Sequence, residues 1–190
     1  MKILKFLGIS VVVLVILFFG IAMFLPSEVH VERTLIIPAS EEVVFDQIND
    51  LRHWKNWSPW HKMDPEMIIT YEGFLQGEGA SYRWKSDKVG SGQLKITESH
   101  PNQYIATEMD FMEEGNATGY YRFESVEGGT QVTWAFETDM GSDPIDKYVG
   151  LIMDRMIGSD FEKGLNNLKN HVKTIPSNMA TKDLSAETTN

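Results

Sequence analysis

The sequence contains no cysteine and few basic residues. Without cysteine there is no disulfide framework, no thiolate metal site and no cysteine nucleophile. Only 17 lysines and arginines stand against 27 aspartates and glutamates, and this net charge of -10 argues against a nucleic-acid binder. Hydrophobic residues nevertheless make up 42% of the 190 residues, so the composition is that of a folded chain. The length fits one domain of about 100–150 residues.

The motifs of common catalytic and cofactor sites are also missing. No Gly-x-Ser-x-Gly motif, phosphate-binding loop or dinucleotide fingerprint occurs. His53, His61 and Asp64 lie near one another, but their spacing is not that of a zinc site. We therefore assign no catalytic residue, no metal site and no cofactor from the sequence.

One long stretch carries no charge. Residues 6–25 read FLGISVVVLVILFFGIAMFL, and Ser10 is the only polar side chain among them. Twenty helical residues span about the 30 Å of a bilayer core. We expect residues 1–27 to be an uncleaved, single-pass membrane anchor. A cleaved signal peptide is the alternative, but it would have a shorter apolar region and a small-x-small cleavage site; a buried soluble helix is the third possibility.

The charges around this stretch predict its orientation. Lys2 and Lys5 precede it, and no other basic residue lies before residue 33. By the positive-inside rule, the N-terminus is in the cytoplasm and the rest of the chain lies outside the cytoplasmic membrane. All 27 acidic residues lie beyond the anchor. Because this acidity discourages docking on anionic head groups, we expect the anchor to hold the protein at the membrane.

Strand patterns dominate the next part of the chain. Alternation of apolar and polar residues predicts a strand over 29–37, ended by Pro38. Glycine-rich and Pro-Asn turns separate six further candidates. These candidates cover residues 67–72, 80–85, 92–99, 104–111, 118–125 and 130–140. The short connections between them imply an antiparallel sheet.

Helices are predicted on either side of these strands. Ser40 followed by two glutamates marks the start of a short helix, and the aromatic segment 51–65 predicts a short helix or a turn-rich linker. Ser142-Asp143-Pro144, a capping residue followed by proline at the first helical position, opens a long helix to about residue 173. Its apolar residues recur in two series, with a bend expected at Gly158-Ser159. The series are Ile145, Val149, Ile152 and Met156, then Phe161, Leu165, Leu168 and Val172.

This order of elements predicts an α+β domain over residues 28–174, followed by a disordered tail over 175–190. A curved antiparallel sheet of about seven strands would wrap around the long C-terminal helix. The space between the sheet and the helix is then either filled by side chains or left as a ligand cavity.

With this order of elements, the sequence resembles the polyketide cyclase/dehydrase and lipid-transport family of the START-like (SRPBCC, helix-grip) superfamily. The segments that carry the likeness are VERTLIIPAS at 31–40 and EEVVFDQINDLRHWKNWSPW at 41–60. The family pattern covers about residues 29–172 and does not include the anchor. The resemblance implies a common cavity and no shared catalytic motif.

The resemblance also implies which side chains contact a ligand. We expect these to be the inward-facing aromatic, methionine and isoleucine residues of the sheet, the helix and the tryptophan segment. They are Trp54, Trp57, Trp60, Trp84, Met109, Phe111, Trp134, Phe136, Met153 and Ile157. The tryptophans of the 54–60 segment either form the rim of the cavity or plug one end of the core, and the methionines are either adaptable pocket walls or core filler.

Three functions follow from these observations. The leading hypothesis is a membrane-tethered domain that binds a hydrophobic small molecule or lipid. The second is a cyclase or dehydratase, which needs polar groups such as Tyr82, Tyr120, Arg122 or a histidine inside the cavity. The third is a non-catalytic envelope protein with a filled core. Glu108 and Asp110 alternate with apolar residues, and we expect both to face solvent.

Overall fold

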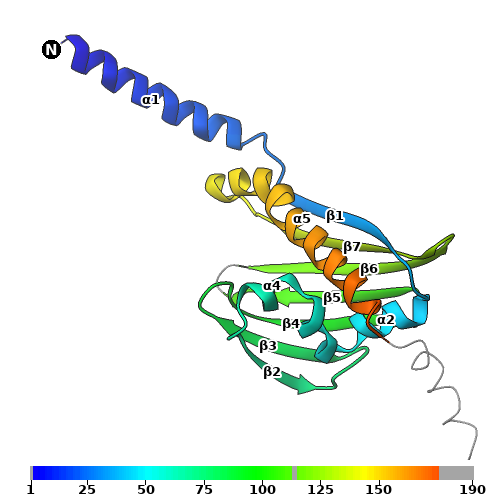
Figure 1. Ribbon diagram of the computed structural model, residues 1–190. Coiled ribbons are helices and arrows are strands. Elements are labelled where there is room, and N and C mark those ends of the chain that lie inside the picture. The colour runs from blue at the N-terminus through cyan, green and yellow to red at the C-terminus, as the bar shows by residue number, and fades with distance from the viewer. Residues whose placement is uncertain (1, 113–114, 176–190) are drawn as a thin grey trace, which may run out of the picture.

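The computed structural model describes residues 2–112 and 115–175. The chain runs from an N-terminal helix into a seven-stranded sheet and ends in a long helix (Figure 1). The elements are α1 (Lys2–Ala22), β1 (Glu28–Ile37), α2 (Glu41–Asn49), the 3-10 helix η1 (Leu51–His53), α3 (Trp54–Trp57), α4 (Pro59–Met63), β2 (Ile68–Gly73), β3 (Ala80–Ser86), β4 (Gly90–His100), β5 (Tyr104–Asp110), β6 (Asn116–Val126), β7 (Gly129–Asp139) and α5 (Pro144–Val172). The tail predicted to be disordered lies outside the described residues, apart from residue 175.

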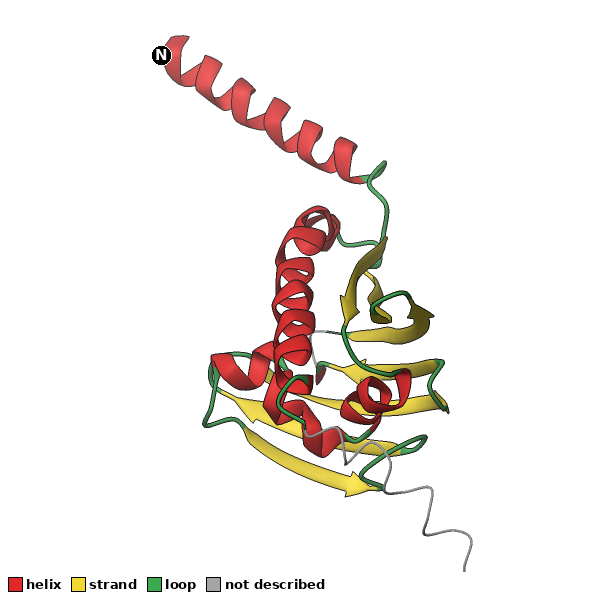
Figure 2. Cartoon of the chain, turned by 45° about the vertical axis from the view of Figure 1, so that its right-hand side comes forward, coloured by secondary structure: helices red, strands yellow, loops and turns green. Residues whose placement is uncertain are grey.

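The sheet is antiparallel throughout and has the strand order β1-β7-β6-β5-β4-β3-β2. The first strand therefore pairs with the last, from Glu28 opposite Asp139 to Ile37 opposite Thr130. The sheet curves around α5, and the short helices lie on the same face of the sheet as α5 (Figures 1 and 2). This arrangement confirms the predicted α+β helix-grip class.

Alternation along the strands decides which side chains enter the core. On β1, Val31 and Ile37 are fully buried, whereas the intervening even-numbered residues are exposed. On the second half of α5, Phe161, Leu165 and Leu168 are buried against the sheet. The predicted periodicities therefore describe the contact between the sheet and this half of the helix correctly.

The start of α5 follows from its capping residues. The carboxylate of Asp143 accepts hydrogen bonds from the N–H groups of Ile145 at 2.7 Å and Asp146 at 3.5 Å, and Pro144 is in the first turn. The helix continues without interruption through Gly158, where the sequence suggested a bend. Its first turns lie at an angle to the remainder (Figures 1 and 2).

The first of the two apolar series predicted on α5 is largely exposed. Ile145 is 65% exposed, Ile152 is 53% exposed and Met156 is 56% exposed. The helix turns this stripe away from the sheet, because Gly150 and Asp154 occupy the side that faces β1.

The N-terminal helix α1 contains a 20-residue apolar stretch, Ile3–Ala22, with a mean hydropathy of 2.7. None of the 18 residues in its most hydrophobic window is buried in the protein. By length and composition this helix is able to cross a membrane or to act as a signal sequence.

Candidate functional site

A cavity of about 360 Å³ lies between the sheet and α5. Most of its wall is aromatic or aliphatic, and its residues come from α3, α4, α5 and strands β3 to β7. They include Trp54, Trp60, Tyr82, Trp84, Leu94, Met109, Phe111, Tyr121, Trp134, Phe136, Met140, Met153, Met156, Ile157 and Phe161. Side chains therefore do not completely fill the space between the sheet and α5.

The structure brings together nine of the ten side chains predicted to contact a ligand. Only Trp57 does not line the cavity. It is fully buried, and its indole N–H donates to the carbonyl of Gln47 at 2.9 Å. Trp54 lines the cavity but is held in the same way, because its N–H donates to the carbonyl of Ile48 at 2.8 Å. The tryptophan segment was expected either to form the rim of the cavity or to plug one end of the core, and these two residues are part of the core.

Trp134 is the centre of the aromatic wall. Its ring stacks on Phe161 with the centroids 4.0 Å apart and the planes 10° apart, so sheet and helix meet directly here. The Tyr121 ring also stacks on Trp134, with the centroids 5.1 Å apart, and the Trp60 ring contacts Trp134 edge-on, with the centroids 5.7 Å apart. Such a wall holds a fixed shape and offers flat apolar surfaces to a ligand.

Three polar atoms in this wall have no hydrogen-bond partner within the described residues: the hydroxyl oxygens of Ser58 and Tyr121, and Nδ1 of His61. Ser58 and Tyr121 are each only 1% exposed. A buried polar group without a partner costs about 1–3 kcal/mol, so these groups are open to hydrogen bonding with a ligand.

Burial sets the protonation state of the ionisable groups in the cavity. It lowers the pKa of His61 and raises the pKa values of Tyr82 and Tyr121. At neutral pH the imidazole is therefore uncharged and both phenols keep their protons. The site combines hydroxyl donors with a neutral imidazole in apolar surroundings.

The sequence left open which tyrosines enter the cavity, and the strand register decides this. Tyr82 and Tyr121 line it, whereas Tyr120 and Arg122 lie on the outer face. Tyr120 donates a hydrogen bond to Glu32 at 2.7 Å, and burial together with this bond raises the pKa of Tyr120 to about 12. Sequence reasoning missed Tyr121 and Ser58; the buried neighbours of Tyr121 on β6, Ala117 and Phe123, carry the signal that identifies the inward face.

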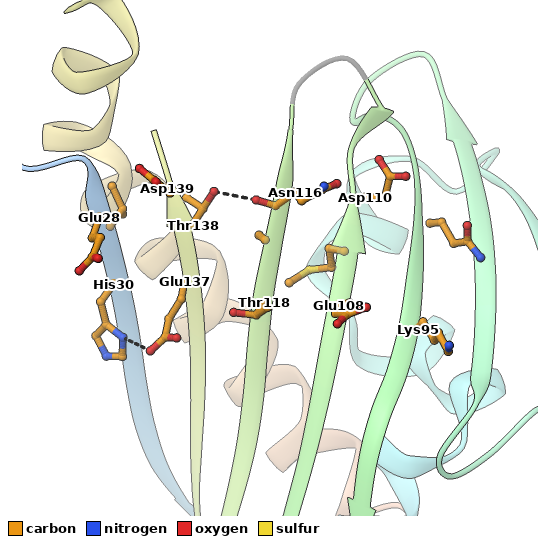
Figure 3. Close-up of a pocket in the computed structure, with 14 residues that line it drawn as sticks. Glu28, His30, Lys95, Glu108, Asp110, Asn116, Thr118, Glu137, Thr138 and Asp139 are labelled. Carbon is orange, nitrogen blue, oxygen red and sulfur yellow. Dashed lines mark hydrogen bonds and ion pairs between the residues drawn. The ribbon is translucent and has the colours of Figure 1, made fainter. Parts of the chain in front are cut away.

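A second hollow, of about 1030 Å³, lies on the outer face of the sheet (Figure 3). Acidic side chains dominate it, including Glu108 and Asp110, which face solvent as predicted. His30 and Glu137 pair at 3.0 Å in this hollow. Among residues 2–112 and 115–175, no cluster of three or more histidines or carboxylates has the geometry to hold a metal ion.

The comparison with protein families identifies this architecture. The model of the polyketide cyclase/dehydrase and lipid transport family matches residues 28–173. The chain belongs to this family. The match leaves out α1 and covers the whole sheet and α5. No curated protein sequence matches the chain significantly.

Solved structures share the fold at low sequence identity. A protein of unknown function from Staphylococcus aureus superposes with a TM-score of 0.60 at 18% identity, over 77% of this chain and 94% of its own. The di-domain ARO/CYC protein StfQ of the steffimycin biosynthetic pathway gives 0.60 at 11% identity, over 77% of this chain and 51% of its own. Ara h 8.0201 gives 0.56 at 15% identity, over 78% and 99%. The family and this fold indicate a helix-grip domain of ligand-binding or cyclase/dehydrase type.

Proposed function

We propose that this protein binds a hydrophobic small molecule or lipid in the cavity between the sheet and α5, and that α1 holds it in a membrane while it does so. The cavity carries the proposal: about 360 Å³ is within the range of small-molecule sites, and its wall is mostly aromatic and aliphatic. A structural protein with a filled core, which is the alternative, would have no such space.

The polar atoms of the wall restrict the chemistry of the ligand. The polar atoms on Ser58, His61 and Tyr121, which have no hydrogen-bond partner within the described part of the chain, line a site that is mostly apolar. A molecule with an apolar body and one or two oxygen functions, such as a carbonyl or a hydroxyl group, would satisfy them. The expected ligand is therefore amphipathic rather than a pure hydrocarbon.

Membrane tethering supports this function physically. An apolar molecule partitions into the bilayer, and a receptor fixed to the same bilayer meets it at a high effective concentration. The apolar stretch Ile3–Ala22 is long enough for a single span. Lysines on its N-terminal side only favour a cytoplasmic N-terminus and a domain outside the cytoplasmic membrane.

Titration of the full chain in detergent with the apolar fluorescent probe N-phenyl-1-naphthylamine tests the proposal. Met153→Trp puts extra volume into the cavity and is expected to weaken probe binding at least tenfold. Leu151→Trp is the matched control, because Leu151 is 55% exposed on the same helix and does not line the cavity. Equal affinity in the two variants, with both folded by circular dichroism, would show that the probe binds elsewhere.

One observation favours an enzyme as the second candidate. The neutral imidazole of His61 and the hydroxyl of Tyr121 line the same mostly apolar cavity, and neither Nδ1 of His61 nor the Tyr121 hydroxyl has a hydrogen-bond partner in residues 2–112 and 115–175. The imidazole would accept a proton from a carbon next to a carbonyl group, and the tyrosine would donate a hydrogen bond to the carbonyl oxygen. If the protein is an enzyme of this kind, His61→Gln abolishes turnover of an aromatic or polyketide-like substrate and changes the affinity for the probe by no more than about twofold.

A further inference from the structure

An apolar stripe on the first half of α5 has no partner among the residues that the structure describes. Ile145, Val149, Ile152 and Met156 follow one another at intervals of four, three and four residues, so they lie along one side of the helix. Their side chains are 65%, 37%, 53% and 56% exposed. Four large apolar residues in one row at the surface indicate an interaction site.

The stripe lies next to the end of α1. The ring of Tyr148, one residue before Val149, stacks on Phe18 of α1 with the centroids 4.6 Å apart and the planes 19° apart. The Tyr148 hydroxyl donates to the carbonyl of Phe18 at 3.1 Å, and the Lys147 ammonium group donates to the carbonyl of Ala22 at 3.4 Å. These contacts join the second turn of α5 to the last turns of α1.

The contacts also fix how deep α5 lies relative to a membrane that contains α1. Phe18 is four residues before the end of the helix at Ala22, which is about 6 Å inside the end of the span at 1.5 Å per residue. A tyrosine stacked on Phe18 therefore lies at the level of the lipid–water boundary, where tyrosine is favoured. Met23 and Phe24, which follow α1, are 80% and 89% exposed and add apolar surface at this end of the helix.

We infer that the first turns of α5 lie in the lipid interface of the bilayer, with the stripe of Ile145, Val149, Ile152 and Met156 inserted among the lipids. This inference rests on the proposed membrane anchor and goes beyond it, because it assigns a second lipid-binding surface to the folded domain.

This docking places the opening of the cavity at the lipid surface. Met156 belongs to the stripe, is more than half exposed and also lines the cavity, so it stands at the rim. Met153 and Ile157 continue the cavity wall from the same turns of α5. An apolar ligand would then pass from the bilayer into the cavity over methionine and isoleucine side chains, without crossing water.

Hydrophobic contact, rather than charge, holds this surface to the lipid. The domain is acidic, and the turns that carry the stripe hold Asp143, Asp146 and Asp154 beside Lys147 and Arg155, so they have no excess of positive charge. Anionic head groups are therefore not required, and a neutral phosphatidylcholine bilayer is the appropriate probe.

The absence of cysteine allows a direct test with single-cysteine variants of the full chain. In Ile152→Cys, a thiol-reactive NBD dye is attached to the new cysteine and reports on the stripe. Ile68→Cys is the matched control, since Ile68 is 63% exposed but lies on the edge strand β2. Leu14→Cys reports on the middle of α1. Each labelled protein is reconstituted into phosphatidylcholine vesicles with a nitroxide on either a shallow or a deep acyl-chain position.

We expect the dye at position 152 to show blue-shifted emission and at least twofold stronger quenching by the shallow nitroxide than the dye at position 68. The dye at position 14 is expected to be quenched most by the deep nitroxide. If position 152 behaves like position 68 while position 14 is deeply quenched, the docking of α5 is wrong and the anchor stands. If position 14 is not quenched, the anchor itself is wrong and the docking falls with it.

Discussion

Arg33 is a charged side chain on the otherwise apolar inward face of β1. Its guanidinium group donates to Asp154 at 2.9 Å and to Glu162 at 2.9 Å, and thereby connects the first strand to two turns of α5. The hydrogen bond from Arg33 lowers the pKa of Asp154. Alternation along residues 29–37 places Arg33 on the same face as Val31 and Ile37, but its partners lie more than 120 residues away and cannot be read from this pattern.

Replacement of Arg33 tests this connection. Arg33→Met keeps the aliphatic part and removes the ion pairs, and we expect a loss of about 1–2 kcal/mol in the free energy of unfolding, measured by urea denaturation. Arg83→Met is the control, since Arg83 is 56% exposed and faces Glu72 at 3.5 Å, and it is expected to change stability much less. Equal losses in the two variants would mean that Arg33 does not fix α5 to the sheet.

His61 makes stability depend on pH. Burial lowers its pKa in the folded chain below the value of about 6.5 expected for the unfolded chain. Between these two values the unfolded chain binds more protons, so the free energy of unfolding falls as the pH falls below about 6.5. As the pH falls from 7.5 to 5, we expect the free energy of unfolding of the wild type to decrease more than that of His61→Gln.

Urea denaturation at several pH values measures this difference. His171, whose pKa is also lowered by burial, is present in both proteins and cancels in the comparison. Parallel pH profiles for the wild type and His61→Gln would contradict the burial of a neutral imidazole at this position.

Residue-level prediction succeeded where alternation is strong and failed where register decides. Trp134 and Phe136 alternate clearly with polar residues, and both line the cavity as expected. Tyr120 and Tyr121 are adjacent and chemically alike; the alternation with Ala117 and Phe123 on β6 favours Tyr121 as the inward one, and the pairing of Tyr121 with Trp134 decides it. That pairing is a long-range fact that the sequence of β6 alone does not contain.

At the scale of elements, α5 approaches the sheet most closely at its glycines. A Cβ atom at Gly164 would lie 2.7 Å from the Trp134 ring and 3.1 Å from Pro59. A Cβ atom at Gly158 would overlap the guanidinium group of Arg33. These positions let the helix axis come near the aromatic wall and the Arg33 ion pairs.

Gly164→Ala is therefore expected to destabilise the protein, although alanine is the better helix former by about 1 kcal/mol. Overpacking against a rigid indole ring costs about 1–3 kcal/mol, and the net effect should be a lower melting temperature. Gly150→Ala is the control, because its Cβ would meet only Cγ2 of Val29 and Cγ of Met140, at 3.1 and 3.2 Å, which a side-chain shift of a few tenths of an ångström relieves. A gain in stability for Gly164→Ala would contradict the close contact.

The order and type of the elements followed from the sequence, with strand ends within about two residues. The start of α5 followed as well, because a capping aspartate and a proline are local signals. The orientation of its first half did not follow, since a 4-3-4 spacing defines a face but does not say what covers it. Ile145 and Ile152 lie on that face and are exposed, whereas Phe161 and Leu165 of the next series are buried.

At the scale of the whole molecule, an apolar helix is joined to an acidic domain that contains an apolar cavity. We expect the full chain to stay with the membrane fraction after washes with 1 M salt and with alkaline carbonate, because burial of Ile3–Ala22 in lipid does not depend on charge. Removal of residues 1–27 should release the chain into the supernatant on repeated dilution, because the hydrophobic contact of the α5 stripe alone is weak and reversible. Release of the full chain by salt alone would contradict a membrane-spanning α1.

The central claim is that the cavity holds one apolar molecule with an oxygen function. Native mass spectrometry of the full chain, purified from its membranes and freed from detergent in the gas phase, tests it most directly. We expect one bound small molecule per chain, extractable into organic solvent and largely lost in Met153→Trp but kept in Leu151→Trp. A bare chain mass for the wild type, or the same occupancy in both variants, would contradict it.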